Sequence, residues 1–239
     1  MAERWRGPIL WALLLGPAAT AMQAQAAVED EQLWLQANTN VPVAQDVRLT
    51  LEQIARFSDR QGGLFQSELG ALLQYRATKR IELGFGYRYV GSHNRNSAAN
   101  ENRFRVQAVG SFGRVSTRLR VDARFNPRGD EIGFRIRPLV RYNHPLGREG
   151  VFLFGTHESF LIPNSTSWGQ RSGYERMRNT VGLAFPIGKQ VAADLGYLNE
   201  YRFGRGGARD QVNHALSLQL TVNLRPVHLR QRPDDSSTH

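Results

Sequence analysis

The residues with the clearest chemical potential are a histidine and a serine two positions apart. His157 and Ser159, in the segment FGTHESF, share one face if that segment is a strand, because a strand turns successive side chains to opposite faces. Glu158 lies between them, and Glu175 follows further along the chain. A serine beside an imidazole, backed by a carboxylate, can act as an acyl-transfer nucleophile. Side chains at i and i+2 on a strand lie about 7 Å apart, and no second motif supports the pair. His157 and Ser159 are therefore weak catalytic candidates, and we expect a protein that is not an enzyme.

Thiol and metal chemistry find no support in the sequence. The chain has no cysteine, which excludes disulfides, thiolate metal sites and cysteine nucleophiles. No pair of histidines has the spacing of a zinc site, and the loops hold no acidic cluster of the calcium-binding kind. We expect no metal and no cofactor.

The elements that carry these residues follow a two-residue period. In RIELGFGYRYV, residues 80–90, apolar side chains alternate with glycine or charged residues, which indicates a strand with one apolar and one polar face. The mean hydropathy of −0.45 and the lack of a long apolar run argue against a membrane-spanning helix. The expected strands are 32–40, 47–58, 64–76, 80–92, 102–112, 114–125, 131–143, 151–161, 174–185, 190–203 and 211–224.

Short turns and longer polar loops alternate between these segments, as in outer-membrane barrels with short periplasmic turns and longer external loops. The fold class that we expect is therefore all-β, an antiparallel transmembrane up-and-down β-barrel. The segments number about eleven, whereas bacterial barrels usually have an even number of strands. Either the first segment is not a wall strand, or one strand was merged or missed. We expect about 10–12 strands and favour 12.

The ends of the chain indicate export. Residues 1–26 have the charged start, the apolar ILWALLL stretch and the Ala-Gln-Ala site of a cleavable signal peptide, with cleavage after Ala26. Residues 27–224 form the expected barrel, and residues 225–239 form a polar tail that we expect to be disordered. The expected location is the outer membrane of a Gram-negative bacterium.

Arginines dominate the polar face of the strands. The net charge is +10, and nearly all of the basic residues are arginines. A charge facing lipid at mid-depth costs about 2–4 kcal/mol, so we place these side chains in the lumen. The lumen arginines are Arg103, Arg105, Arg118, Arg120, Arg124, Arg135, Arg137, Arg141, Arg176 and Arg178. Their acidic partners are Glu52, Glu68, Glu82, Asp122, Glu158, Asp194 and Glu200.

This arginine wall has two interpretations. Arginines and acids can fill a narrow barrel as a hydrogen-bonded network, because the guanidinium fork binds carboxylates bidentately. Alternatively, the excess of base favours anions, as arginine-lined pores do, which predicts a small anion-preferring pore or solute-binding barrel. A third possibility is a plugged barrel that binds lipopolysaccharide or an envelope partner through loops 93–101 and 163–173. The expected partners are outer-membrane lipid, lipopolysaccharide, the barrel-assembly machinery and a small anionic solute, with no nucleic acid.

Four segments follow one another in a characteristic order: EDEQLWLQANTNVPVAQDVRLTLEQIARF, LFQSELGALLQYRATKRIELGFGYRYV, YERMRNTVGLAF and VAADLGYLNEY. Together they resemble domain-of-unknown-function family 2490, which comprises predicted outer-membrane barrels of Gram-negative bacteria. The resemblance implies a location and a fold, and it carries no catalytic residues. Its recurrent features match Trp34, Glu52, Arg56, Gly86, Tyr87, Arg88, Tyr89, Arg176, Arg178, Gly196 and Tyr197. Separately, the pair His157 and Ser159 is similar to the H-x-S pair of outer-membrane lipid A deacylases, which would imply an acyl hydrolase of lipid A or phospholipid.

Overall fold

The structure, a computed structural model, describes residues 26–147 and 149–225 and contains β-strands without helices in that part of the chain. None of the described residues forms a helix long and apolar enough to cross a membrane. The strands are β1 (Val28–Ala44), β2 (Val47–Ser58), β3 (Gly63–Arg76), β4 (Ile81–Ser92), β5 (Glu101–Phe112), β6 (Val115–Phe125), β7 (Gly133–Pro145), β8 (Phe152–Ile162), β9 (Gly173–Pro186), β10 (Val191–Arg202) and β11 (Gln211–Asn223).

The two-residue period in the sequence becomes an inside and an outside in the fold. On β4 the side chains of Phe85 and Tyr87 are 58% and 39% exposed on the outer face. Arg88, the next residue, is only 7% exposed and points into the barrel. The other strands alternate in the same way, as a closed sheet with one apolar wall requires.

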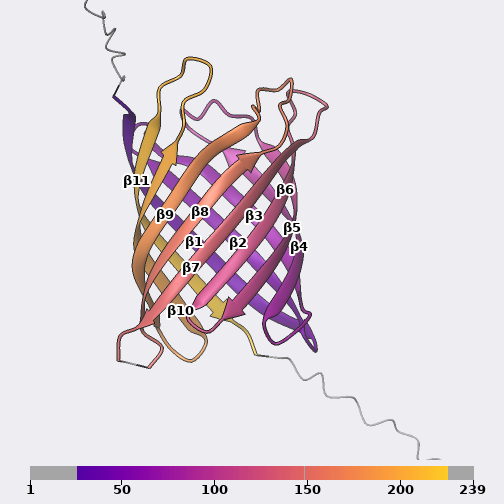
Figure 1. Ribbon diagram of the computed structural model, residues 1–239, viewed down its shortest axis with the longest axis vertical. Helices are drawn as coiled ribbons and strands as arrows, with labels where there is room; N and C mark the ends of the chain where they lie inside the picture. The colour runs from indigo at the N-terminus through magenta and orange to yellow at the C-terminus, as the bar shows by residue number, and fades with distance from the viewer. Residues whose placement is uncertain (1–25, 148, 226–239) are drawn as a thin grey trace, which may run out of the picture.

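The strands close into a barrel with one parallel seam (Figure 1). Each strand pairs antiparallel with its neighbours in sequence, and β1 also pairs parallel with β11, from Val28 opposite Gln211 to Asn40 opposite Asn223. An up-and-down chain with an odd number of strands has first and last strands that run the same way, so their closing pair must be parallel. The barrel therefore has eleven strands, within the expected range and one fewer than the favoured 12, and the expectation of purely antiparallel pairing is wrong at this seam.

The first segment is a full wall strand, and it accounts for the odd count. β1 pairs with β2 as well as with β11, so both of its edges are hydrogen-bonded within the wall. The described chain begins at the end of the barrel that carries the longer loops and finishes at the opposite end (Figure 1). The expected signal peptide lies almost entirely outside the described residues, as does nearly all of the expected tail.

The barrel interior is polar, and the outer wall is apolar. The one cluster of buried apolar side chains within the described residues consists of Trp34, Leu198 and Ala215. Buried charged residues, such as Glu68 and Arg105, instead fill much of the lumen. A water-soluble fold would bury its apolar face, so this distribution is the reverse of the one that water favours.

Two glycines allow the backbones of β9 and β10 to approach closely. Gly182 and Gly196 are opposite one another in the register. A Cβ atom added to Gly182 would lie 2.2 Å from the carbonyl oxygen of Leu195 and 2.6 Å from the Cα atom of Gly196. A side chain at position 182 would therefore push the two strands apart.

Candidate functional site

The structure places all of the lumen residues named from the sequence on the inner face of the wall. The arginines Arg103, Arg105, Arg118, Arg120, Arg124, Arg135, Arg137, Arg141, Arg176 and Arg178 are buried or half-buried there, as are Glu52, Glu68, Glu82, Asp122, Glu158, Asp194 and Glu200. Most of them are joined by ion pairs. The lumen is therefore a connected network and not a row of independent charges.

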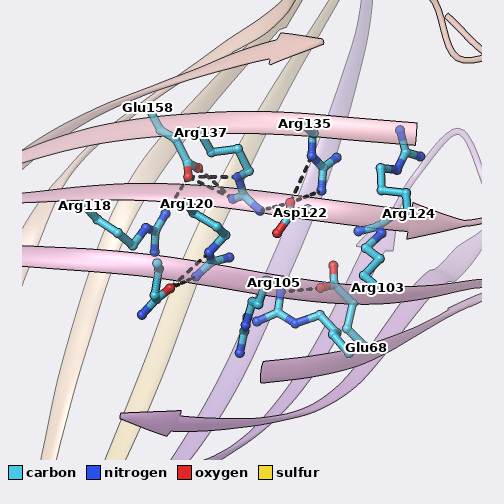
Figure 2. A network of polar contacts seen from close by, with 12 residues as sticks. Glu68, Arg103, Arg105, Arg118, Arg120, Asp122, Arg124, Arg135, Arg137 and Glu158 are labelled. Carbon is cyan, nitrogen blue, oxygen red and sulfur yellow. Dashed lines mark hydrogen bonds and ion pairs between the residues drawn. The ribbon is translucent and has the colours of Figure 1, made fainter. Parts of the chain in front are cut away.

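Glu158 on β8 is the most heavily shared carboxylate at mid-height. It is 3% exposed and accepts hydrogen bonds from Arg118 of β6 at 2.5 Å, from Arg137 of β7 at 3.0 Å and from Arg178 of β9 at 3.4 Å. Asp122 of β6 continues the chain of contacts: Arg135 donates to it at 2.8 Å, and Arg137 lies 3.6 Å away (Figure 2). Arg137 thus bridges two buried carboxylates.

A second group of ion pairs lies on β2 to β5. Arg88 donates to Glu68 at 2.6 Å and to Glu52 at 2.7 Å, and Arg105 of β5 also donates to Glu52. The Glu52–Arg105 pair joins strands that are not neighbours in the wall, so it bridges β3 and β4 on the lumen side. Arg56 pairs with Glu68 at 3.0 Å.

Aromatic rings complete the packing at mid-height. The guanidinium groups of Arg56 and Arg178 lie 4.2 Å and 4.5 Å from the ring centroid of Trp34, one of the family-like positions. Arg137 and Arg178 also lie 4.5 Å and 4.9 Å from the centroid of Phe160. Cation–π contacts of this kind strengthen when water is excluded. Charged and aromatic side chains together therefore occupy the middle of the barrel.

Two chambers lie on either side of this packed layer. One, of about 480 Å³, extends toward the short-turn end, and the other, of about 320 Å³, extends toward the long-loop end. Both are lined by Trp34, Arg56, Arg137 and Arg178, which form the layer between them. We call the larger cavity the short-turn chamber and the smaller one the long-loop chamber.

Arg120, in the wall of the short-turn chamber, differs from most of the lumen arginines because it is not paired with a carboxylate in the described chain. It is 5% exposed and forms no salt bridge within residues 26–147 and 149–225; its Nε and Nη2 atoms donate to Oε1 of Gln107 at 3.2 Å and 3.0 Å. Arg137 is directly opposite Arg120 on the adjacent strand, which brings two cations together. Nearby, Nε and Nη1 of buried Arg105 have no hydrogen-bond partner in the part of the chain that the structure describes. This part of the wall has more positive charge than its carboxylates balance.

Sequence reasoning missed two carboxylates of the network. The sequence predicts Glu101 in a loop, but this residue begins β5, and its carboxylate accepts a hydrogen bond from Arg124 at 2.6 Å. Glu175 pairs with Arg176 at 2.9 Å, although adjacent residues of a regular strand face opposite ways. The pairing of β8 with β9 shifts between Phe160 and Leu161, so a bulge lets both residues reach the lumen. The hydrogen-bond partners of the arginines, and not alternation, identify such residues.

His157 and Ser159 lie together on the outer wall, away from the lumen network. Nε2 of His157 is 3.0 Å from Oγ of Ser159, and Nδ1 of His157 is 2.7 Å from Oδ1 of Asn179 on β9. Neither Glu158 nor Glu175 backs the histidine, because both carboxylates are on the lumen side. Asn179 takes that place, and it was not among the sequence candidates. The cross-strand register, which sets His157 opposite Asn179, was the signal that could have found it.

The long loops are held by carboxylates at their bases. Asp210, just before β11, accepts a hydrogen bond from the hydroxyl of Tyr201 and another from the backbone N–H of Gly204 at 2.7 Å. These two donors lower the pKa of the Asp210 carboxyl. Glu131 likewise accepts from the backbone of Ser167, which lowers its pKa. The ionised forms of these groups therefore tie the loops at this end of the barrel.

No group of three or more metal-ligating side chains occurs among residues 26–147 and 149–225.

The fold and the two sites define a class of protein, a closed β-barrel with an apolar outer wall and an ion-paired lumen. The chain belongs to a family described as "Protein of unknown function (DUF2490)", whose model matches residues 31–213. An uncharacterised protein of Methylorubrum extorquens is 32% identical over 213 residues, which cover 85% of this chain and 92% of that protein.

Solved structures are similar to this chain at lower sequence identity. One comes from a study of in-meso crystallisation of membrane proteins, with 13% identity, a TM-score of 0.40, and coverage of 77% of this chain and 79% of that one. Another is the siderophore receptor PirA from Pseudomonas aeruginosa, with 14% identity, a TM-score of 0.30, and coverage of 77% of this chain and 37% of that one.

Proposed function

We propose that this protein is an outer-membrane β-barrel whose short-turn chamber binds a small anionic solute. The outer wall supports a membrane location, because large apolar side chains such as Leu69, Phe85 and Leu119 are more than half exposed around the barrel. In water such a wall would aggregate, whereas in a bilayer it contacts lipid tails and lipopolysaccharide. Insertion by the barrel-assembly machinery fits the same location.

The observation that carries the binding proposal is Arg120. A buried guanidinium loses several kcal/mol of hydration. The neutral amide oxygen of Gln107, which accepts from Arg120, offsets less of that loss than a carboxylate would. The unpartnered nitrogens of Arg105 and the cation opposite, Arg137, add to the positive potential. An anion seated in the chamber would accept hydrogen bonds from Arg120 and Arg137, which line it, and offset the cost. The chamber volume of about 480 Å³ suits a small organic anion or phosphate.

The packed middle layer favours binding over conduction. Trp34, Arg137 and Glu158 are each less than 9% exposed, so little water reaches them. An ion that crossed the barrel would have to separate the Arg137–Glu158 pair at 2.9 Å. The lumen therefore holds a solute from one end and does not pass it freely.

The test is a calorimetric titration of the folded protein in detergent with inorganic phosphate and with succinate. We expect saturable binding of at least one of them, and a loss of at least tenfold in affinity in Arg120→Gln. Arg202→Gln is the matched control, since Arg202 is also a lumen arginine without a salt bridge in the described chain but lines the long-loop chamber. Binding to neither probe, or equal loss in both variants, would overturn the proposal.

A further inference from the structure

The outer wall of β8 and β9 carries a hydrogen-bonded relay of polar side chains on a surface that otherwise contacts lipid. The hydroxyl oxygen of Ser159 lies 3.0 Å from the hydroxyl oxygen of Tyr174 and 3.0 Å from Nε2 of His157. Nδ1 of His157 lies 2.7 Å from Oδ1 of Asn179. His157 and Asn179 are exposed, and Ser159 is half-buried. Around them the wall is apolar, with Leu161 38% and Val181 52% exposed. Polar groups on a wall that contacts lipid are costly, and where they occur they often mark a functional site.

From this geometry we infer that Ser159, His157 and Asn179 form a serine acyl-hydrolase site that faces the bilayer. Oδ1 of Asn179 can only accept a hydrogen bond, so Nδ1 of His157 carries the proton. Nε2 then presents its lone pair to the hydroxyl of Ser159, which is the arrangement of a nucleophile, a general base and an orienting group. This differs from the sequence-based expectation of a protein that is not an enzyme.

The position of the site selects the substrate. Ser159 precedes the end of β8, Ile162, by three residues, which places it about 8 Å below the rim at the long-loop end. An aromatic cluster lies beside it, in which the ring centroid of Phe203 is 5.2 Å from that of Tyr174 and 4.9 Å from that of Tyr201. Aromatic rings gather where the acyl chains meet the headgroups. The ester carbonyls of lipids lie at this level, so the substrate class is a fatty-acyl ester of a membrane lipid.

The reaction balances with water as the only co-reactant. Oγ of Ser159 attacks the ester carbonyl carbon while Nε2 of His157 takes the hydroxyl proton, and the oxyanion accepts a hydrogen bond from the hydroxyl of Tyr174. The alcohol leaves with the proton from His157, and an acyl-Ser159 ester remains. Water then attacks this ester, gives its proton to His157, and releases the fatty acid as the proton returns to Oγ. The net reaction converts an ester and water into an alcohol and a fatty acid.

The inference rests on the membrane location proposed above and is independent of the anion site in the lumen. The barrel also supplies a matched control: Oγ of Ser67, on the outward face of β3, lies 2.7 Å from Nε2 of His93, but no amide or carboxylate is bonded to that imidazole within the described residues. Ser67→Ala should therefore leave activity unchanged, whereas Ser159→Ala removes the nucleophile.

The experiment uses the full-length folded barrel in detergent micelles, with folding checked by heat-modifiable gel migration. Fatty-acid release is measured from phosphatidylglycerol and, separately, from purified lipopolysaccharide, and a long-chain alkyl fluorophosphonate serves as a covalent probe. We expect release from at least one lipid, which identifies the source of the ester, and probe attachment at Ser159. Ser159→Ala should lower release by at least about 10³-fold and abolish labelling. Asn179→Ala should lower both at least tenfold.

Two outcomes would overturn the inference. One is the absence of both fatty-acid release and labelling in the folded wild-type protein. The other is labelling of Ser67 to the same extent as Ser159, which would show that the relay through Asn179 confers no special reactivity. Neither outcome would affect the titration of the lumen with phosphate or succinate, so this inference and the proposed function can fail separately.

Discussion

Glu158 offers the sharpest test of the idea that ion pairs hold the lumen together. Its carboxylate accepts hydrogen bonds from Arg118, Arg137 and Arg178 and is 3% exposed. Glu158→Gln keeps the shape and one acceptor oxygen but removes the negative charge that three buried guanidinium groups share. Removal of one partner from a buried ion pair destabilises proteins by about 3–5 kcal/mol. Because one acceptor survives, we expect a loss of about 3 kcal/mol, which is roughly a hundredfold in the folded-to-unfolded ratio.

The assay is reversible urea unfolding of the barrel in lipid vesicles, followed by tryptophan fluorescence and gel migration. Asp46→Asn is the matched control, because the Asp46–Arg76 pair is separated by 3.9 Å and both side chains are largely exposed, at 43% and 61%. Exposed pairs of this kind contribute less than about 1 kcal/mol. A loss below about 1 kcal/mol in Glu158→Gln, or a loss equal to that of the control, would refute the reasoning.

Other consequences of the fold can be checked with similar methods. Gly182→Ala should lower the free energy of unfolding by about 1–3 kcal/mol through backbone overlap, whereas Gly155→Ala, which meets open space, should change it little. Because hydrogen bonds lower the pKa of Asp210, its stabilisation of the β10–β11 loop is present at neutral pH and is lost as pH falls through that lowered pKa; hydrogen exchange of the loop should show this, and Asp210→Asn should remove it. Ala37→Cys combined with Leu220→Cys should form a disulfide across the seam, because these residues are partners only in the parallel register, and failure to cross-link under oxidation would contradict that register.

Much of the fold could be predicted from the sequence, because alternation is a local property. The alternation of Phe85 and Tyr87 on one face with Arg88 on the other predicts strands such as β4. Closure is not local. The sequence showed an odd number of segments, and the general preference of bacterial barrels for even numbers favoured a different count. Only the register between β1 and β11 shows that a parallel seam resolves the discrepancy.

The candidate sites were predictable to different degrees. Alternation placed the lumen arginines on one face, because whether a residue is at an odd or an even position along a regular strand is enough to decide its face. It failed at Glu175, where a bulge between β8 and β9 breaks the parity. The orienting residue of the outer-wall cluster, Asn179, is far from His157 in sequence and could not be recognised without the cross-strand register. Pairing across strands, and not composition, decides which polar residues meet.

The most direct test of the proposed solute-binding function is the electrical behaviour of the protein in planar bilayers. The layer of Trp34, Arg56, Arg137 and Arg178 lies between the two chambers, so folded protein should insert without producing steady conductance steps. Discrete, ohmic, anion-selective steps that diminish in Arg120→Gln would contradict a closed lumen and show instead that the arginines line a conducting path.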